Sequence, residues 1–147
     1  IVYIVNSGGQ PTASNAARLL AIKSAQSGRN VLLCDTTGNS EKEIKEKTKV
    51  EESSLSIHSI NENMSIMTGT DSSSFFTSKT LNKTIKDLAE RFDQVFICTS
   101  NRNVHLGLMA LQEFVPGLVM ISGLRKTKKS DVKKIKSRQP TDVLFYD

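Results

Sequence analysis

The stretch Ser7-Gly8-Gly9-Gln10-Pro11-Thr12-Ala13-Ser14 decides the fold, because it joins an apolar run at 1–5 to a helix-forming run at 12–27. A strand, a glycine-bearing turn and a helix are the context of a phosphate-binding loop, whose pattern is Gly-x-x-x-x-Gly-Lys-Ser. Here Thr12 stands at the second glycine of that pattern and Ala13 at its lysine. The stretch therefore predicts the architecture of such a loop without its charge.

The lysine of this motif supplies a point charge to a bound phosphate, which Ala13 cannot do. Thr12 is β-branched and is a poor substitute where the backbone must approach a ligand closely. Backbone amides can still bind an anion weakly, and Ser14 keeps the hydroxyl that would hold magnesium. We expect a vestigial phosphate loop made of Gly8, Gly9, Gln10, Thr12, Ala13 and Ser14.

Length and composition predict one globular domain over residues 1–147, with 37% hydrophobic residues to form a core. The chain begins with Ile1 inside a predicted strand, so we expect a piece of a longer polypeptide. No apolar run approaches the ~20 residues that cross a bilayer, and we expect a cytoplasmic location. Cys34 and Cys98 fit no metal-binding spacing, which predicts buried free thiols.

Strand-like and helix-like segments alternate along the chain, which predicts an α/β fold with a parallel, doubly wound sheet in three layers. We expect strands near 1–5, 30–35, 64–68, 94–99, 116–121 and 142–146. We expect helices near 12–27, 74–91, 103–113 and 128–137. The polar stretch 36–62 is interpreted as a loop with a short helix at 41–47.

Basic residues are concentrated in segment 125–138, which holds eight Lys or Arg and one acidic residue, Asp131. Such a segment can meet acidic lipid, nucleic acid or an acidic protein surface. It can also be the solvated face of a helix that packs through Val132 and Ile135. No aromatic residue interrupts the basic run, which argues against stacking on single-stranded nucleic acid.

Four segments, at 12–21, 25–35, 78–99 and 117–132, resemble the nucleotide-binding domain of bacterial tyrosine kinases. These domains are the cytoplasmic part of capsular and exopolysaccharide co-polymerases, the chain-length determinants. ATPases of the MinD and ParA type look similar. The stretch Ala-Gln-Ser-Gly-Arg-Asn-Val-Leu-Leu-Cys-Asp at 25–35 is similar to the family's Ala-Gln-Ala-Gly-Lys-Arg-Val-Leu-Leu-Ile-Asp. The resemblance implies a P-loop NTPase-like fold with degenerate Walker motifs.

The departures from this family concern its charged ligands. The family's loop lysine falls on Ala13, and the aspartate that organises magnesium falls on Cys98. A thiol does not replace a carboxylate toward hard magnesium. Asp35 is kept, so Ser14 and Asp35 are the vestigial metal ligands, although a lone carboxylate at a strand end can instead cap the turn that follows. The resemblance therefore implies that no catalytic residue remains.

The first hypothesis is a pseudo-enzyme that regulates polysaccharide assembly or chain length, tethered to the bacterial inner membrane through segments outside these residues. It would self-associate, contact polysaccharide-assembly proteins and need no cofactor, and its basic segment 125–138 would meet acidic surfaces other than nucleic acid. One alternative is an active tyrosine kinase or ATPase that binds ATP or ADP with magnesium through another lysine, such as Lys23. The other is a degenerate positioning protein of the MinD or ParA type. His58 and His105 have no partners at catalytic or metal-binding spacing and are expected to be ordinary polar residues.

Overall fold

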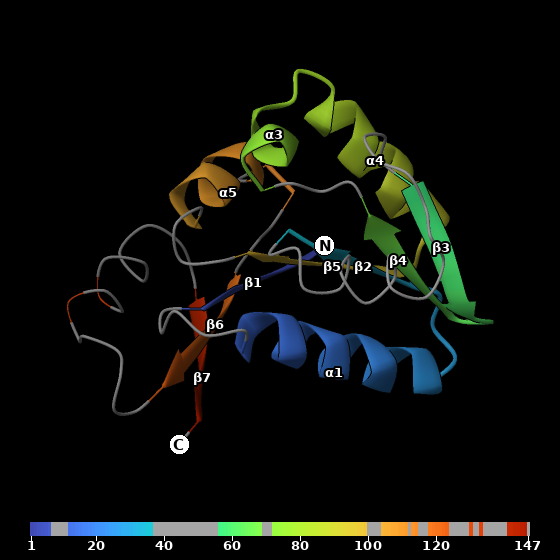
Figure 1. Ribbon diagram of the computed structural model, residues 1–147, viewed down its shortest axis with the longest axis horizontal. Coiled ribbons are helices and arrows are strands. Elements are labelled where there is room, and N and C mark those ends of the chain that lie inside the picture. The colour runs from blue at the N-terminus through green and yellow to red at the C-terminus, as the bar shows by residue number, and fades with distance from the viewer. Residues whose placement is uncertain are drawn as a thin grey trace.

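The computed structural model describes residues 1–6, 12–36, 56–68, 72–99, 104–111, 113–114, 118–123, 130, 133 and 141–146. The strands are β1 (Val2–Asn6), β2 (Val31–Asp35), β3 (Ser56–Asn61), β4 (Met64–Thr68), β5 (Gln94–Thr99), β6 (Leu118–Gly123) and β7 (Thr141–Tyr146). The helices are α1 (Thr12–Gln26), α3 (Ser72–Thr77), α4 (Leu81–Arg91) and α5 (Val104–Leu111). These strands form one sheet in the order β3-β4-β2-β5-β1-β6-β7 (Figure 1). The predicted α/β class is confirmed.

Helices lie on both faces of the sheet. In Figure 1, α1 lies below the sheet, and α3, α4 and α5 lie above it. The buried cluster on the α1 face includes Ile4, Leu33 and Phe96, and the cluster on the opposite face includes Leu32 and Ile97. Because both faces of the central strands are covered, β2 is buried along its whole length and β5 along all but its first residue. This explains why both strands are continuous apolar runs in the sequence.

Helix α1 turns its small side chains toward the sheet. Three alanines spaced four residues apart and one serine are buried on that side: Ala17, Ala21, Ala25 and Ser14. These short side chains let the helix lie close to the strands beneath it. The larger Leu19 and Leu20 are on the outer side, 67% and 37% exposed. After the helix, Gly28 adopts a φ of 87°, a left-handed conformation that glycine tolerates best.

The order of the strands places several loops at one edge of the sheet. Strands β1, β2, β4, β5, β6 and β7 pair in parallel, so their carboxyl ends share that edge. The connection through α1 runs from β1 past β5 to β2, whereas the connection through α5 runs from β5 past β1 to β6. Neighbouring strands β1 and β5 thus send the chain in opposite directions. Ligands of open α/β sheets bind at such points.

The prediction that 36–62 is a loop with a short helix at 41–47 is wrong over its last part, because β3 occupies Ser56–Asn61. This strand pairs antiparallel with β4 across a tight turn, so the sheet is not wholly parallel. The turn is fixed by the N–H of Asn63, which donates to Oδ1 of Asn61 at 3.0 Å. The strand has only a weak hydrophobic signal because it lies at the sheet edge, where Ile57 alone among its residues packs against a core cluster.

The predicted helix at 74–91 is two helices, α3 and α4, which are separated by residues 78–80. The Ser78 hydroxyl accepts a hydrogen bond from the N–H of Thr80 at 3.3 Å and contacts the Thr80 hydroxyl at 3.0 Å. Such local side-chain bonds compete with helical backbone bonding, which explains the break. Apolar residues on both sides of the break still pack in one cluster.

The other predicted elements are confirmed within one to two residues at most ends, including the strands near 1–5, 30–35, 64–68, 94–99 and 142–146 and the helix near 12–27. The predicted helices at 41–47 and, apart from residues 130 and 133, 128–137 lie outside the described residues. Within the described part of the chain, every helix is too short or too polar to span a membrane.

Candidate functional site

The first turn of α1 and the end of β2 meet through Ser14 and Asp35. The Ser14 hydroxyl donates a hydrogen bond to the Asp35 carboxylate, with 2.5 Å between Oγ and Oδ2. Both side chains are buried, with 4% and 1% of their surfaces exposed. The two residues expected to be vestigial metal ligands therefore lie in direct contact.

Cys98 lies on the other side of the same carboxylate. It is the register partner of Asp35 across β2 and β5, and its Sγ donates a weak hydrogen bond to Oδ1 at 3.3 Å. Burial raises the pKa of the Cys98 thiol well above its ordinary value, and the neighbouring Asp35 raises it further. The thiol is therefore neutral at physiological pH, and each Asp35 oxygen accepts a hydrogen bond from a neutral group.

Cys34 faces the opposite side of the sheet from Cys98, since the two residues belong to different core clusters. Its Sγ lies 3.9 Å from Sδ of Met67, and burial raises its pKa to about 12, with a smaller contribution from Asp35. Both cysteines are free, as predicted from their spacing. The two thiols cannot join in a disulfide while they lie on opposite faces of the sheet.

Ser14, Asp35 and Cys98 supply few ligands for a hard cation such as magnesium. Magnesium takes its ligands from several oxygen atoms in octahedral geometry. Here one carboxylate and one hydroxyl hydrogen-bond to each other, and the third group is a neutral thiol. In the part of the chain that the structure describes, no three His, Cys, Asp or Glu residues gather to form a metal site. The described residues at this edge of the sheet therefore do not fit a magnesium ion.

The remaining loop residues are only partly described. Gly8, Gly9 and Gln10 lie outside the described residues, and the structure gives only the backbone of Thr12 and Ala13, in the first turn of α1. The turn after Asp35 also leaves the described part of the chain at residue 37, so capping of that turn stays a prediction.

Lys23 does not substitute for the loop lysine. It lies in the last turn of α1 and is exposed, nine residues after Ser14. At 1.5 Å per residue this places it about 13 Å along the helix axis from the first turn. The kinase alternative therefore requires a different cation.

Two buried threonines at the same edge of the sheet were missed in the sequence. The Thr36 hydroxyl donates to the Cys98 carbonyl oxygen at 2.8 Å, which ties the end of β2 to β5. The Thr99 hydroxyl is fully buried at the end of β5 and has no hydrogen-bond partner among the described residues. Neither threonine was singled out in the sequence, because the pattern of apolar residues does not reveal which hydroxyl groups are hydrogen-bonded.

No protein-family model matches the sequence, and no curated protein matches it. Solved structures do match the fold. The chimerical protein CapA2B2 aligns with a TM-score of 0.72 and 19% identity over 97% of this chain and 75% of that protein. The BceF tyrosine kinase domain aligns with a TM-score of 0.66 and 16% identity over 97% and 67%. An ATP complex of a variant McdA from Cyanothece aligns with a TM-score of 0.63 and 15% identity over 98% and 68%.

At these identities the matches establish the fold alone, which this chain shares with CapA2B2, the BceF tyrosine kinase domain and McdA. They confirm the fold that the resemblance in the loop and strand motifs implied. Chemistry belongs to individual residues and does not follow from a shared fold.

Proposed function

We propose that this chain is a catalytically inactive, doubly wound P-loop domain with degenerate Walker motifs, which regulates polysaccharide assembly through protein contacts. The observation that carries the proposal is the hydrogen bond from the Cys98 thiol to Asp35. In the family that the sequence resembles, a carboxylate stands at the position of Cys98. A neutral thiol stands there, and Ala13 stands in place of the loop lysine. Two of the charges that phosphoryl transfer uses are therefore missing.

The loss of these two charges is large in energetic terms. Phosphoryl transfer depends on positioning and on charge stabilisation more than on covalent chemistry by the protein. Removal of a single neutral donor from a preorganised site typically costs about 2.7–4 kcal/mol of transition-state stabilisation. Losing both a lysine and a metal carboxylate exceeds that cost, which supports a binding or scaffolding role.

Calorimetric titration with ATP and ADP, with and without magnesium, tests the proposal directly. We expect no heat of binding up to millimolar nucleotide, because the triphosphate meets neither the lysine nor a bound metal ion. Magnesium-dependent binding at micromolar nucleotide would overturn the proposal. It would favour the alternative of an active kinase or ATPase with rearranged ligands. The McdA variant that aligns with this chain has a similar fold and is in complex with ATP.

A gain-of-function variant tests whether the site is disabled only by its chemistry. The double substitution Ala13→Lys with Cys98→Asp restores both charges, and we expect it to bind magnesium-ATP at least about tenfold more tightly than the unmodified chain. Ala89→Lys with Cys98→Asp is the matched control, because residue 89 is exposed on α4. No gain in the first variant, or an equal gain in the control, would contradict a disabled but intact site.

The role in polysaccharide assembly rests on the sequence resemblance and on the fold. We place the domain in the cytoplasm, tethered to the inner membrane by other parts of a longer chain, where it self-associates and contacts assembly proteins. Deleting residues 1–147 from that parent chain should change the length distribution of the host's surface polysaccharide, as measured by gel electrophoresis. An unchanged distribution would contradict this role.

The MinD or ParA alternative has a separate test in the basic segment 125–138. A positioning protein of this kind would bind DNA or anionic vesicles with a strong dependence on salt concentration. Under the proposed function the segment meets acidic protein surfaces, so DNA should not bind at physiological salt. Salt-sensitive DNA binding that is lost when the segment's lysines are changed to glutamine would favour the alternative.

A further inference from the structure

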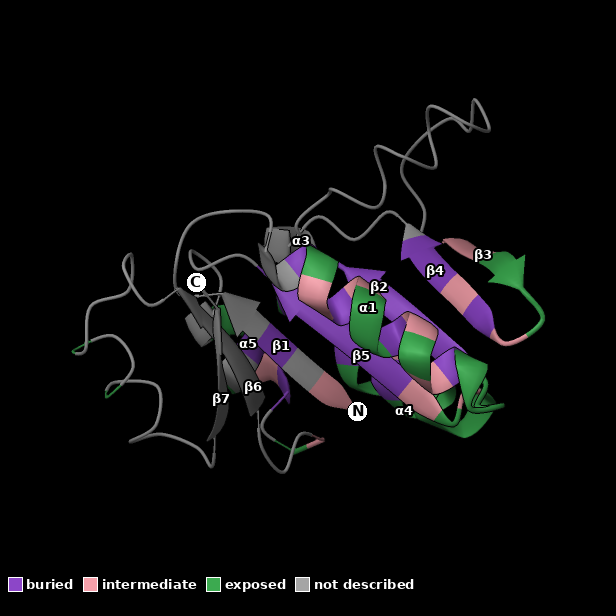
Figure 2. Ribbon diagram, turned by 90° about the horizontal axis from the view of Figure 1, so that it is seen from below, coloured by how far each residue is buried: buried purple, intermediate pink, exposed green. Residues whose placement is uncertain are grey.

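Helix α1 presents apolar side chains to solvent on its outer side. Leu19 is 67% exposed and Leu20 is 37% exposed, while the side of the helix against the sheet carries alanines. In Figure 2 the helix crosses the front of the molecule with its exposed residues toward the viewer. Among the described elements it is the single helix on this face of the sheet (Figure 1). Its outer side is therefore not covered by another described helix.

A hollow lies beside this helix. A cavity of about 330 Å³ separates the last turns of α1 from the turn between β3 and β4. Its lining comes from both elements: Ile22, Ala25 and Gln26 on the helix, and Asn61, Glu62 and Asn63 on the hairpin. Leu19 stands one turn before Ile22 on the same side of the helix. These seven residues are called the α1 groove, and Ile60 beside it is 51% exposed.

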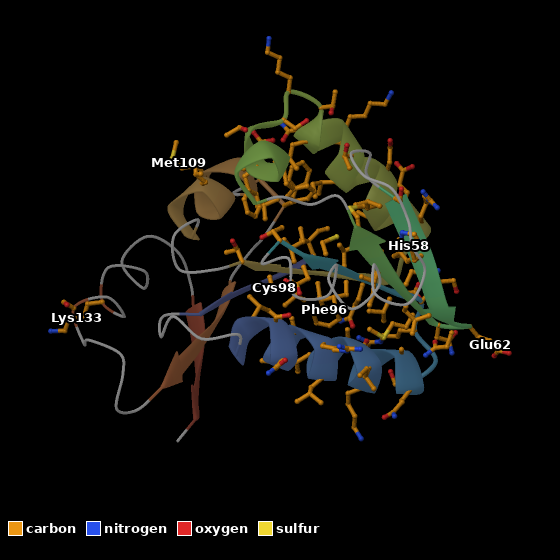
Figure 3. All side chains as sticks on the ribbon, viewed as in Figure 1. His58, Glu62, Phe96, Cys98, Met109 and Lys133 are labelled. Atoms are coloured by element: carbon orange, nitrogen blue, oxygen red, sulfur yellow. The ribbon has the colours of Figure 1, made fainter. Side chains whose placement is uncertain are left out.

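Positive charge predominates on the helix side of the α1 groove. Residues 12–29, which hold α1 and the turn after it, include no Asp or Glu. Lys23 and Arg29 are exposed along this segment. The one charged residue in the lining of the hollow is Glu62, at the tip of the hairpin, so the positive charge lies on the helix side of the groove (Figure 3). An occupant that carries negative charge beside apolar residues therefore complements the helix side of the groove, provided that its acidic residues face away from Glu62.

We propose that the α1 groove binds an acidic amphipathic helix of a partner protein. Such a helix presents apolar residues at intervals of three and four, which can fill the hollow between helix and hairpin. Its acidic residues would lie against Lys23 and Arg29. A second copy of this chain fits less well, because it would bring two basic helices together. A lipid bilayer would contact Leu19 and Leu20 but leave the concave part of the groove unfilled.

The proposal concerns a surface away from the Ser14–Asp35 contact, because the groove lies at the opposite end of α1. It deepens the proposed role in protein contacts. Its test uses no nucleotide, so failure of the docking proposal and failure of the proposed inactivity give separate results.

The probe is a short fluorescein-labelled helical peptide with leucine at helical spacing and glutamate elsewhere, titrated by fluorescence anisotropy. The charge-matched control peptide carries lysine in place of every glutamate. We expect saturable binding of the acidic peptide and at least tenfold weaker binding of the basic one. Leu19→Gln and Lys23→Glu should each weaken the acidic peptide's binding at least about fivefold. Both positions are exposed, so thermal melts should show that these variants remain folded.

Met109→Gln is the matched control variant, because Met109 is 71% exposed on α5, on the opposite face of the sheet. It should bind the acidic peptide as the unmodified chain does. The proposal is overturned by no binding at millimolar peptide, by equal binding of the two peptides, or by an equal loss in Met109→Gln. Leu19-dependent binding to vesicles of phosphatidylglycerol without peptide binding would assign the surface to lipid instead. Leu19-dependent dimerisation in ultracentrifugation would assign it to a second copy.

Discussion

The hydroxyl of Ser14 and the carboxylate of Asp35 are joined by a buried hydrogen bond of 2.5 Å, which links the start of α1 to the end of β2. With the Cys98 thiol on the other oxygen, Asp35 serves as an acceptor that connects three elements of the fold. A residue that could bind a cation is thus engaged in structural contacts. This relationship leads to predictions about stability as well as about binding.

Ser14→Ala removes one donor from the buried Asp35 carboxylate. Hydrogen bonds to charged groups contribute about 1.5–3 kcal/mol, so we expect the free energy of unfolding to fall by that amount. Urea denaturation measures it. Asn15→Ala, at an exposed neighbouring position, should change stability by less than about 0.7 kcal/mol. If the two variants were equally stable, the bond between Ser14 and Asp35 would contribute nothing.

Cys98→Asp places a second carboxylate against Asp35 in a buried site. Two carboxylates that share a site raise the pKa of one of them, so the folded variant holds a proton that the unfolded chain releases. Relative to the unmodified chain, its free energy of unfolding should therefore decrease as pH rises from about 4 to 7. Magnesium added at neutral pH should restore part of the loss.

The neutral variant Cys98→Asn is the control for that experiment, since it adds polarity without charge. Its stability should follow the pH dependence of the unmodified chain and should not respond to magnesium. Thermal melts across this pH range compare the three proteins. A Cys98→Asp variant with the same pH profile as Cys98→Asn would show that the two carboxylates do not interact.

The sequence was sufficient to predict the strands whose burial on both faces leaves continuous apolar runs, such as β2 and β5. It was insufficient for β3, because an edge strand is held by backbone pairing with β4 and needs few apolar residues. The break at Ser78 depends on a local side-chain bond that periodicity does not reveal. The hydrophobic pattern of a sequence predicts which residues are buried, but it does not predict their side-chain hydrogen bonds.

Only part of the candidate site could be predicted, because a sequence shows motif positions but not the contacts between them. Ser14 stands at a position of the phosphate-loop motif, so the spacing of that motif identified it, whereas Asp35 and Cys98 were identified from the resemblance to a family pattern. The contact between Ser14 and Asp35 depends on how closely α1 lies to the sheet, and therefore on alanines that no site motif includes. Thr99 could not be predicted because its lack of a partner is a property of the packed structure.

Alkaline pH should destabilise the protein through Cys34. Burial raises its pKa from 9.0 to about 12 in the folded state, so the unfolded chain loses this proton at a lower pH than the folded protein does. Stability is therefore retained below about pH 9 and lost as pH rises toward 12, by up to about 1.4 kcal/mol per pH unit for this thiol. Urea denaturation between these values should show a shallower dependence for Cys34→Ala. Identical slopes would mean that the thiol does not titrate as its burial requires.

The close approach of α1 to the sheet should make Ala21 intolerant of larger side chains. Ala21 is fully buried, so Ala21→Leu should reduce stability by about 1–3 kcal/mol through overpacking. Leu19→Ala, on the exposed side of the helix, should change it by less than about 0.5 kcal/mol. Thermal melts of the two variants test whether enlarging the buried alanine costs more stability than truncating the exposed leucine. A large loss for Leu19→Ala would show that the leucine is covered in the folded protein.

Thr99 and Thr36 should respond in opposite directions to the same substitution. Both are buried threonines at the carboxyl edge of the sheet, and valine has nearly the same shape. Thr99→Val removes a hydroxyl that has no partner among the described residues, so it should raise the free energy of unfolding by about 1 kcal/mol.

Thr36→Val removes a hydroxyl that donates to the Cys98 carbonyl oxygen at 2.8 Å, so it should lower the free energy of unfolding by about 0.5–1.5 kcal/mol. Urea denaturation of both variants under the same conditions compares the signs directly, and the similar shapes cancel most packing effects. If Thr99→Val is destabilising as well, the Thr99 hydroxyl has a partner in solution. That partner would then be sought at the carboxyl ends of β1 and β5, where Thr99 pairs with Val5.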